Sequence, residues 1–195
     1  MGTPGYTRLD ADERRRQLLE VGAELFARHG YENLSMARIA REAGISKALL
    51  FHYFPSKPDF FTATLEQAAA ELANATEPDP ARPPIEQLST SLDAYLSWVE
   101  RHALAYERLI RSVGAVPEVR DLVERVRDET ADRILAGREP APALRAAVRG
   151  WLWFMDGAVL DWLEHRDVDR EHLHALILGT LLGAAEAAGE PLTPG

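Results

Sequence analysis

Apolar residues recur every three or four positions along most of the chain, and we find no convincing stretch in which apolar and polar residues alternate. The first spacing is typical of amphipathic helices, because residues that far apart lie on one helical face. The sequence therefore predicts an all-α protein. The expected helices span residues 12–29, 35–43, 46–54, 56–75, 85–103, 104–113, 117–136, 142–165 and 169–188.

Residues with known capping preferences lie at the ends of the first four of these helices. Gly30 can close the first helix, and Ser35 and Ser46 can each cap the start of a later one. Ser56, with Asp59 three residues further on, resembles a capping box at the start of the fourth. Apolar spacing and caps therefore agree on where these helices begin and end.

The chain divides into a small N-terminal part and a larger C-terminal part. We expect a loose arm over 1–10, a helix-turn-helix domain over 11–57 and a connecting helix over 58–75. Residues 76–84 form the predicted linker, because four prolines among the last seven of them exclude a helix interior. A second helical domain follows over 85–195.

The composition is that of a globular protein and excludes several kinds of chemistry. Of the 195 residues, 46% are hydrophobic and 27% are charged, and none is cysteine. Disulfides, thiolate metal sites and cysteine nucleophiles are therefore excluded. The N-terminal sequence lacks a signal-peptide core, and the longest apolar run, 173–185, is too short to span a membrane. We expect a cytoplasmic protein that does not enter the membrane.

The charges are distributed unevenly along the chain. Residues 1–57 carry nine Lys or Arg and seven Asp or Glu, a net charge of +2, although the whole chain carries −9. Residues 58–195 carry a net charge of −11. Both lysines of the protein, Lys47 and Lys57, lie in one short segment. A weakly basic head on an acidic body is compatible with a nucleic-acid partner for the head alone.

Residues 35–57 have the pattern of a DNA-binding helix-turn-helix, in which a glycine-containing turn separates two short helices. The second helix of such a motif enters the major groove, so its outward side chains meet bases and phosphates. Lys47 can reach a base edge or a phosphate, and Ala48 and Leu49 can lie against a thymine methyl. The candidate DNA contacts are Ser35, Arg38, Ser46, Lys47, Ala48, Leu49, Phe51, His52, Tyr53 and Lys57.

Two pairs of residues complete this prediction. Leu50 and Phe54 are expected to turn inward and hold the second helix against the domain. Tyr53 and Lys57 are expected to flank the groove, where a hydroxyl and an ammonium can bond phosphates.

The landmarks of residues 25–57 resemble the N-terminal domain of the TetR family of transcriptional regulators, over roughly 50 residues. The resemblance implies a regulator, in most cases a repressor, that binds a two-fold symmetric double-stranded DNA operator as a homodimer. It also implies release from the operator by a small-molecule effector, here one that is largely apolar or aromatic. The landmarks are Leu25, Phe26, Gly30, Ser35, Met36, Ile39, Ala40, the run 43–46, the run 50–54, Ser56 and Lys57.

The segment departs from the family's pattern at two positions. The family often has threonine or another small polar residue where this chain has Leu49, and usually tyrosine where it has Phe51. Phe51 lacks a hydroxyl that could bond a phosphate, and Leu49 favours apolar contact with bases. Both changes affect which operator sequence is preferred.

The resemblance implies that the last two helices of the 85–195 domain form a four-helix dimer interface. Residues 142–165 are apolar nearly all round, and Gly179, Gly183 and Ala187 recur at a spacing that lets another helix approach closely. Two recognition helices would then face half-sites about 34–36 Å apart. The candidate interface residues are Ala158, Trp162, Leu173, Ile177, Thr180, Leu181 and Ala184; an ordinary intramolecular core is the alternative.

The same domain is the expected sensor, because aromatic and apolar residues with a few polar tips are typical of small-molecule pockets as well as of helical cores. Asp156 and Asp161 interrupt its most apolar helix, and a buried carboxylate needs a partner. Arg149, Arg108, the other subunit or a cationic ligand could supply it, and a protein partner is favoured. The candidate ligand contacts are Tyr95, Trp98, Tyr106, Leu109, Ile110, Trp151, Phe154 and Met155.

Two other readings remain open. A metal-dependent helical enzyme would need a second Glu-x-x-His pair beside Glu171 and His174, and we find none. His165, His172 and His174 do not share one helical face, so neither a metal nor a cofactor is expected. A DNA-binding regulator that answers to a protein partner and has no small-molecule effector is the second alternative.

Overall fold

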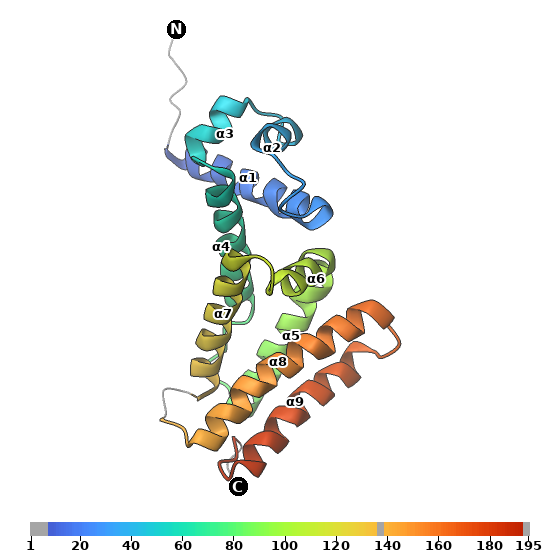
Figure 1. Cartoon of the computed structure of the whole chain (residues 1–195). Coiled ribbons are helices and arrows are strands. Elements are labelled where there is room, and N and C mark those ends of the chain that lie inside the picture. Colours follow the sequence, from blue (N-terminus) through green and yellow to red (C-terminus); the bar gives the residue numbers. More distant parts are fainter. Residues whose placement is uncertain (1–7, 136–138, 193–195) are drawn as a thin grey trace. The chain divides into compact units, whose positions relative to one another are not determined.

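The computed structural model describes residues 8–135 and 139–192, with side chains from Ala11 onward, and these residues form nine helices and no strand (Figure 1). The all-α prediction is confirmed. The helices are α1 (Arg8–His29), α2 (Met36–Glu42), α3 (Lys47–Tyr53), α4 (Lys57–Ala75), α5 (Pro84–Arg101), α6 (Ala103–Ser112), α7 (Pro117–Leu135), α8 (Pro142–His165) and α9 (Arg170–Ala187).

The observed helix ends follow the predicted caps closely, with one correction at the N-terminus. The Oγ atoms of Ser35 and Ser46 accept the backbone N–H of Arg38 and Leu49, at 3.3 and 3.1 Å. Helix α1 begins at Arg8, so the arm predicted for 1–10 is wrong over 8–10, and its residues 1–7 lie outside the described part. The apolar pattern missed this first turn because the polar and arginine-rich sequence there contributes little to an apolar stripe.

The chain divides into two compact units after Ala70, within the predicted connecting helix 58–75 and not in the proline-rich segment. Helix α4 ends at Ala75, as predicted, and α5 begins at Pro84, the last residue of the predicted 76–84 linker. Proline is tolerated at a first helical position, since the N–H that it lacks would have no partner there.

An aromatic cluster forms the core of the N-terminal unit. The ring of Phe60 in α4 is fully buried, and its centroid lies 4.8 Å from that of Phe54, just after α3, and 5.8 Å from that of Phe26 in α1. Leu50 is also fully buried. These side chains join α1, α3 and α4 around one core, so α3 is held through its inner face.

Gly22 allows α1 to approach α4 closely at this core. A Cβ atom on Gly22 would lie 2.5 Å from Cζ of Phe60 and 3.0 Å from Oγ1 of Thr64. Both neighbours are buried, and Thr64 donates its hydroxyl to the Phe60 carbonyl at 2.8 Å. The close packing of the two helices therefore requires glycine at this position.

In the C-terminal unit, α8 and α9 form an antiparallel hairpin (Figure 1). The indole of Trp151 in α8 donates a hydrogen bond to the Ile177 carbonyl of α9 at 2.8 Å. At the turn, the indole of Trp162 donates to the Val168 carbonyl, also at 2.8 Å, and Arg166 takes the left-handed conformation with φ of 53°. The two tryptophans thus fix how the hairpin closes.

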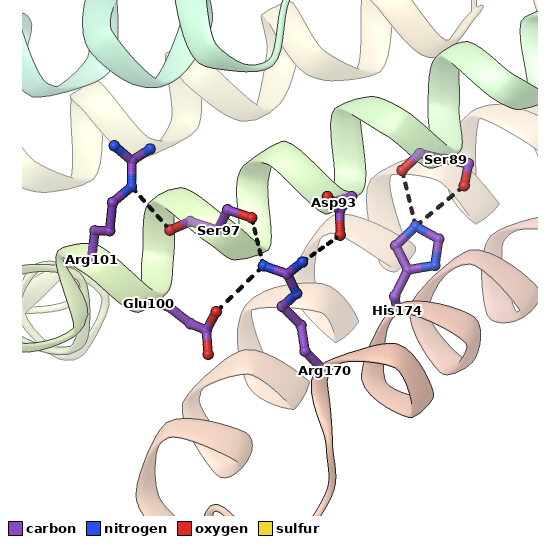
Figure 2. Close-up of polar contacts among 7 residues, drawn as sticks. All are labelled: Ser89, Asp93, Ser97, Glu100, Arg101, Arg170 and His174. Atoms are coloured by element: carbon purple, nitrogen blue, oxygen red, sulfur yellow. Dashed lines mark hydrogen bonds and ion pairs between the residues drawn. The ribbon is translucent and has the colours of Figure 1, made fainter.

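A row of polar side chains joins α5 to α9 (Figure 2). The guanidinium of Arg170 lies 2.6 Å from Oγ of Ser97 and 3.0 Å from a carboxylate oxygen of Asp93. About one turn further along α9, Nε2 of His174 donates to the Ser89 carbonyl at 2.9 Å. These bonds fix the register between α5 and α9.

We predict that Gly22→Ala destabilises the protein, although alanine is the better helix former by about 1 kcal/mol. The added methyl group meets a buried ring, and overpacking of this kind costs about 1–3 kcal/mol. Urea unfolding of the variant would measure the loss. In the double variant Gly22→Ala/Phe60→Leu the two effects should not add, because the smaller side chain makes room; full additivity would contradict the contact.

Candidate functional site

Helix α3 exposes one face and buries the other. Lys47, Ala48, Phe51 and His52 are exposed, whereas Leu50 is fully buried, as expected from the sequence. The Nζ atom of Lys47 lies 5.5 Å from the centroid of the Phe51 ring. A short helix whose inner face is buried can enter a DNA major groove with its exposed face. Here that face carries a cation beside an aromatic ring.

Two of the predicted outward residues are only half-exposed. Leu49 is half-buried, so it offers less of its side chain to a base than the sequence pattern indicates. Tyr53 is half-buried too, and its ring meets that of His52 edge-on at a centroid distance of 5.5 Å.

Arg38 and Ser35, at the start of α2, are partly committed to contacts within the unit. The Ser35 hydroxyl is exposed but caps α2, as described above. Nη2 of the half-buried Arg38 lies 3.0 Å from Nε2 of His29, and its Nε is buried without a partner in the described part of the chain. The Arg38 guanidinium is therefore held against His29 and is not fully available for contact with DNA.

Lys57 differs most from its prediction. Its Nζ atom donates to the carbonyls of Tyr31 and Leu34, at 2.9 and 3.0 Å, and lies 4.0 Å from the centroid of the Tyr31 ring. The ammonium is directed into the unit, so we remove Lys57 from the candidate phosphate contacts. The sequence contained no signal that separates Lys57 from Lys47, since each lysine is the first residue of a helix.

A hydrogen-bonded network of four side chains crosses the C-terminal unit, with one side chain from each of α5, α6, α7 and α8. The hydroxyl of Tyr106 donates to Oδ1 of Asp156 at 2.8 Å, and its oxygen lies 2.6 Å from the hydroxyl of Tyr95. Because the Tyr106 proton is directed at Asp156, Tyr95 is the donor in the second bond. Arg127 binds Oδ2 of Asp156 through Nε at 3.1 Å and Nη2 at 2.5 Å.

This network answers the question of which group pairs with the buried carboxylate. The partner of Asp156 is a protein group, as expected, and that group is Arg127. The candidate Arg149 pairs instead with Asp128, at 2.8 Å. Asp161 is exposed and lies 3.4 Å from Nδ1 of His165, so it needs no buried partner. The position of Arg127 in the sequence did not indicate this pairing, because the pairing depends on how α7 packs against α8.

Burial shifts the acidity of both tyrosines in the network. It raises the pKa of Tyr95 and the pKa of Tyr106 far above the usual value of 10.0, since a phenolate has no water around it there. The negative charge of Asp156 raises both pKa values further. Both hydroxyls therefore stay protonated and can act as hydrogen-bond donors.

The other predicted ligand contacts fall into three groups. Trp98 and Trp151 are buried, and the indole N–H of Trp98 has no partner among the described residues. Leu109, Ile110 and Met155 are half-buried. Phe154 is 37% exposed. A shallow depression of about 460 Å³ lies elsewhere, lined by Ala73, Asn74, Glu77, Pro78, Pro80, Gln87 and Arg133.

Four of the predicted interface residues are buried within their own protomer. Trp162, Leu173, Ile177 and Leu181 are at most 4% exposed, so they form the intramolecular core that was the alternative. Ala158, Thr180 and Ala184 are half-buried. The pattern of apolar residues selected the inner faces of these two helices, because residues of both faces are apolar.

A different set of residues leaves an apolar surface open on α8 and α9. Trp153 in α8 and Leu176 in α9 are 61% and 54% exposed, and Phe154, which follows Trp153 in sequence, is 37% exposed. A Cβ atom on any of four glycines there would meet no atom within 4 Å. We call this surface the α8–α9 outer face; it comprises Gly150, Trp153, Phe154, Gly157, Leu176, Gly179 and Gly183.

The histidines considered as metal ligands are occupied by other contacts. His174 bonds Ser89, His172 lies 2.8 Å from both carboxylate oxygens of Asp169, and His165 bonds Asp161. Within residues 8–135 and 139–192, no three His, Asp or Glu side chains are grouped to hold a metal ion. No helix in those ranges is long and apolar enough to cross a membrane.

Family models match both units of the chain. Residues 18–64 match the family described as bacterial regulatory proteins, tetR family, and residues 84–184 match the tetracyclin repressor-like C-terminal domain. The second match alone spans about half of the chain. It therefore covers a region in which the sequence motifs had given no signal.

Individual relatives agree with these matches. The chain is 26% identical to the transcriptional repressor KstR of Rhodococcus jostii over 161 residues, which are 79% of this chain and 74% of KstR. It is 33% identical to the transcriptional activator FasR of Mycolicibacterium smegmatis over 109 residues, 53% of this chain and 48% of FasR. A tetR-family regulator from Streptomyces coelicolor has a similar structure, with a TM-score of 0.80 and 28% identity, covering 97% of this chain and 84% of that one.

We predict that the protein loses stability as the pH rises above 10, because the unfolded chain then releases phenolic protons that folded Tyr95 and Tyr106 retain. Stability is unaffected by these two groups below pH 10. Urea unfolding between about pH 9 and about pH 11 would measure the slope. The variant Tyr95→Phe/Tyr106→Phe should show a smaller slope, and an identical slope would contradict the assignment.

Proposed function

The chain belongs to the TetR family of DNA-binding transcriptional regulators, and on this premise we propose that it represses transcription from a two-fold symmetric operator until a small effector releases it. The observation that carries the operator part is the exposed face of α3, whose inner face is held by Leu50 and Phe54. A seven-residue helix has little stability alone, so this burial is what presents it to DNA as a fixed surface.

The proposed base contacts come from the exposed residues of α3. Lys47 is placed to reach a guanine edge or a phosphate, while Ala48 and Phe51 offer apolar surface to thymine methyl groups. His52 and the half-buried Tyr53 lie at the end of the helix and are proposed to contact the backbone. Ser46, Ser35, Arg38 and Leu49 are retained as secondary contacts.

We further propose that the protein binds DNA as a homodimer formed through the α8–α9 outer face. Trp153, Phe154 and Leu176 give this face an apolar surface of the kind that marks interaction sites. The glycines have no packing role within the protomer, since a side chain there would meet empty space. Their function is explained if a second copy of the helix approaches them, with Ala158, Thr180 and Ala184 at the edge of the contact.

The effector is proposed to act on the Tyr95–Tyr106–Asp156–Arg127 network. This network joins four helices through groups that are buried and hydrogen-bonded, so a ligand that displaces one bond changes how the helices pack. Nη1 of Arg127 and Nε1 of Trp98 are buried donors without partners, which a ligand could satisfy. Helix α4 spans the division after Ala70, so the two units are joined within one helix of the chain.

A regulator without an effector remains the second candidate. The network residues satisfy most of one another's hydrogen bonds, as a purely structural cluster would. The two functions differ in one respect: only an effector-responsive protein releases its operator when a small molecule binds.

We predict that selection from a random duplex pool at about 0.15 M salt recovers a two-fold symmetric site. Lys47→Ala should weaken binding by about ten- to a hundredfold, because it removes a cation from each recognition helix. Arg120→Ala is a suitable control, since Arg120 is an exposed arginine of α7. A folded protein that enriches no sequence would contradict the repressor proposal unless removing a co-purified ligand restores selection.

We predict that Leu176→Arg converts the dimer into a monomer, because it places a charge within the proposed interface. Leu104→Arg is a matched control: Leu104 is 50% exposed on α6, outside the α8–α9 outer face. Sedimentation at micromolar concentration would distinguish the two species. If both variants stay dimeric, the interface lies elsewhere; if the native protein is a monomer, the homodimer proposal itself is wrong.

A further inference from the structure

Helix α4 begins with a cation, where the physics of a helix favours an anion. Lys57 is its first residue, and the N–H groups of a helix's first turn carry a partial positive charge. Asp59 in the same turn has the favourable sign, and its backbone N–H is capped by Ser56 at 3.2 Å. Groups outside α4 compensate the Lys57 ammonium.

The compensating groups belong to the loop between α1 and α2. The Tyr31 and Leu34 carbonyls accept hydrogen bonds from Nζ of Lys57, and the Tyr31 ring faces the same atom at 4.0 Å. The two carbonyls lie at either end of a turn that is closed by a bond from the Leu34 N–H to the Tyr31 carbonyl, 3.3 Å long. One ammonium thus holds both ends of the turn that leads into α2.

From this geometry we infer that Lys57 is a positioning residue for operator binding and not a phosphate ligand. It fixes the turn before α2 to the first turn of α4, and the position of α2 determines that of α3 through the packing between them. This inference rests on the proposed operator binding by α3. Its structural part, the hold on the loop, can be tested without DNA.

The same loop is held from its other side. The guanidinium of Arg38 in α2 bonds the ring of His29, the last residue of α1, at 3.0 Å. The side-chain amide of Asn33 donates to the His29 carbonyl, also at 3.0 Å. With Lys57, these contacts fix the loop both to α1 and to α4, so a displacement of α4 would pull directly on the turn before α2.

Lysine suits this position better than arginine. Its ammonium is compact and its donors rotate freely, so two can meet carbonyls that differ in direction while a ring covers another side. Arginine carries a planar fork that matches a carboxylate or phosphate. A phosphate-binding site at this position would accept arginine readily, whereas a site that grips two carbonyls would not.

The test compares Lys57→Met with Lys47→Met in the full chain, by measuring affinity for the selected operator duplex between about 0.05 and about 0.2 M salt. The plot of log K against log salt has a negative slope, and each lost phosphate contact reduces the magnitude of that slope by about 0.9, or by about 1.8 for a dimer. We expect Lys57→Met to lose at least about tenfold in affinity with an unchanged slope. A slope reduced by about 1.8 in Lys57→Met would overturn the inference.

Lys57→Arg covers the case in which Lys57→Met does not fold. If Lys57 positions the loop, arginine should bind the operator several-fold more weakly with an unchanged slope; native affinity would mean that Lys57 is a phosphate ligand. Amide hydrogen exchange without DNA gives a second readout. Exchange at Leu34 should accelerate in Lys57→Met and not in Lys47→Met, while exchange in α8 stays unchanged. Native exchange at Leu34 would overturn the inference even if no operator were found.

Discussion

The DNA-binding part of the structure depends on the burial of Leu50 and Phe54 beneath a helix that is too short to persist alone. Seven residues provide few internal hydrogen bonds, and nucleation of a helix is unfavourable, so most of the stability of α3 comes from packing. That packing is provided by Phe60 of α4 and Phe26 of α1, which approach because Gly22 has no side chain. The exposed face of α3 is therefore free to vary with the operator, while its inner face is constrained by the core that it shares with α1 and α4.

A comparable constraint operates in the C-terminal unit, where a carboxylate is buried. An unpaired charge inside a protein is strongly unfavourable, and removing one partner of a buried ion pair costs about 3–5 kcal/mol. Asp156 avoids this cost by binding Arg127 and Tyr106 together, and this requirement holds α6, α7 and α8 in one arrangement.

The sequence predicted the helices well because their signals are local. Apolar spacing and serine caps lie within a few residues of the boundaries that they mark, and the pairs Ser35 with Arg38 and Ser46 with Leu49 appear as expected. The partners of buried charges were not predictable in this way. Arg127 and Asp156 lie on different helices, and nothing in their spacing favours that pair over Arg149. The inner and outer faces of α8 were also indistinguishable, since Trp151 and Trp153 are equally apolar but have opposite exposures.

The two lysines show where residue type and position together carry more information than either alone. Their common location in the helix-turn-helix suggested a common role, yet one ammonium faces outward beside Phe51 and the other faces two carbonyls. The difference follows from the surroundings and not from helix position. Each lysine is the first residue of a helix whose start is capped by the preceding serine, but Lys57 lies beside the loop between α1 and α2, with two carbonyls in reach. With Lys57 turned inward, Lys47 is the one lysine of the helix-turn-helix segment whose ammonium faces outward.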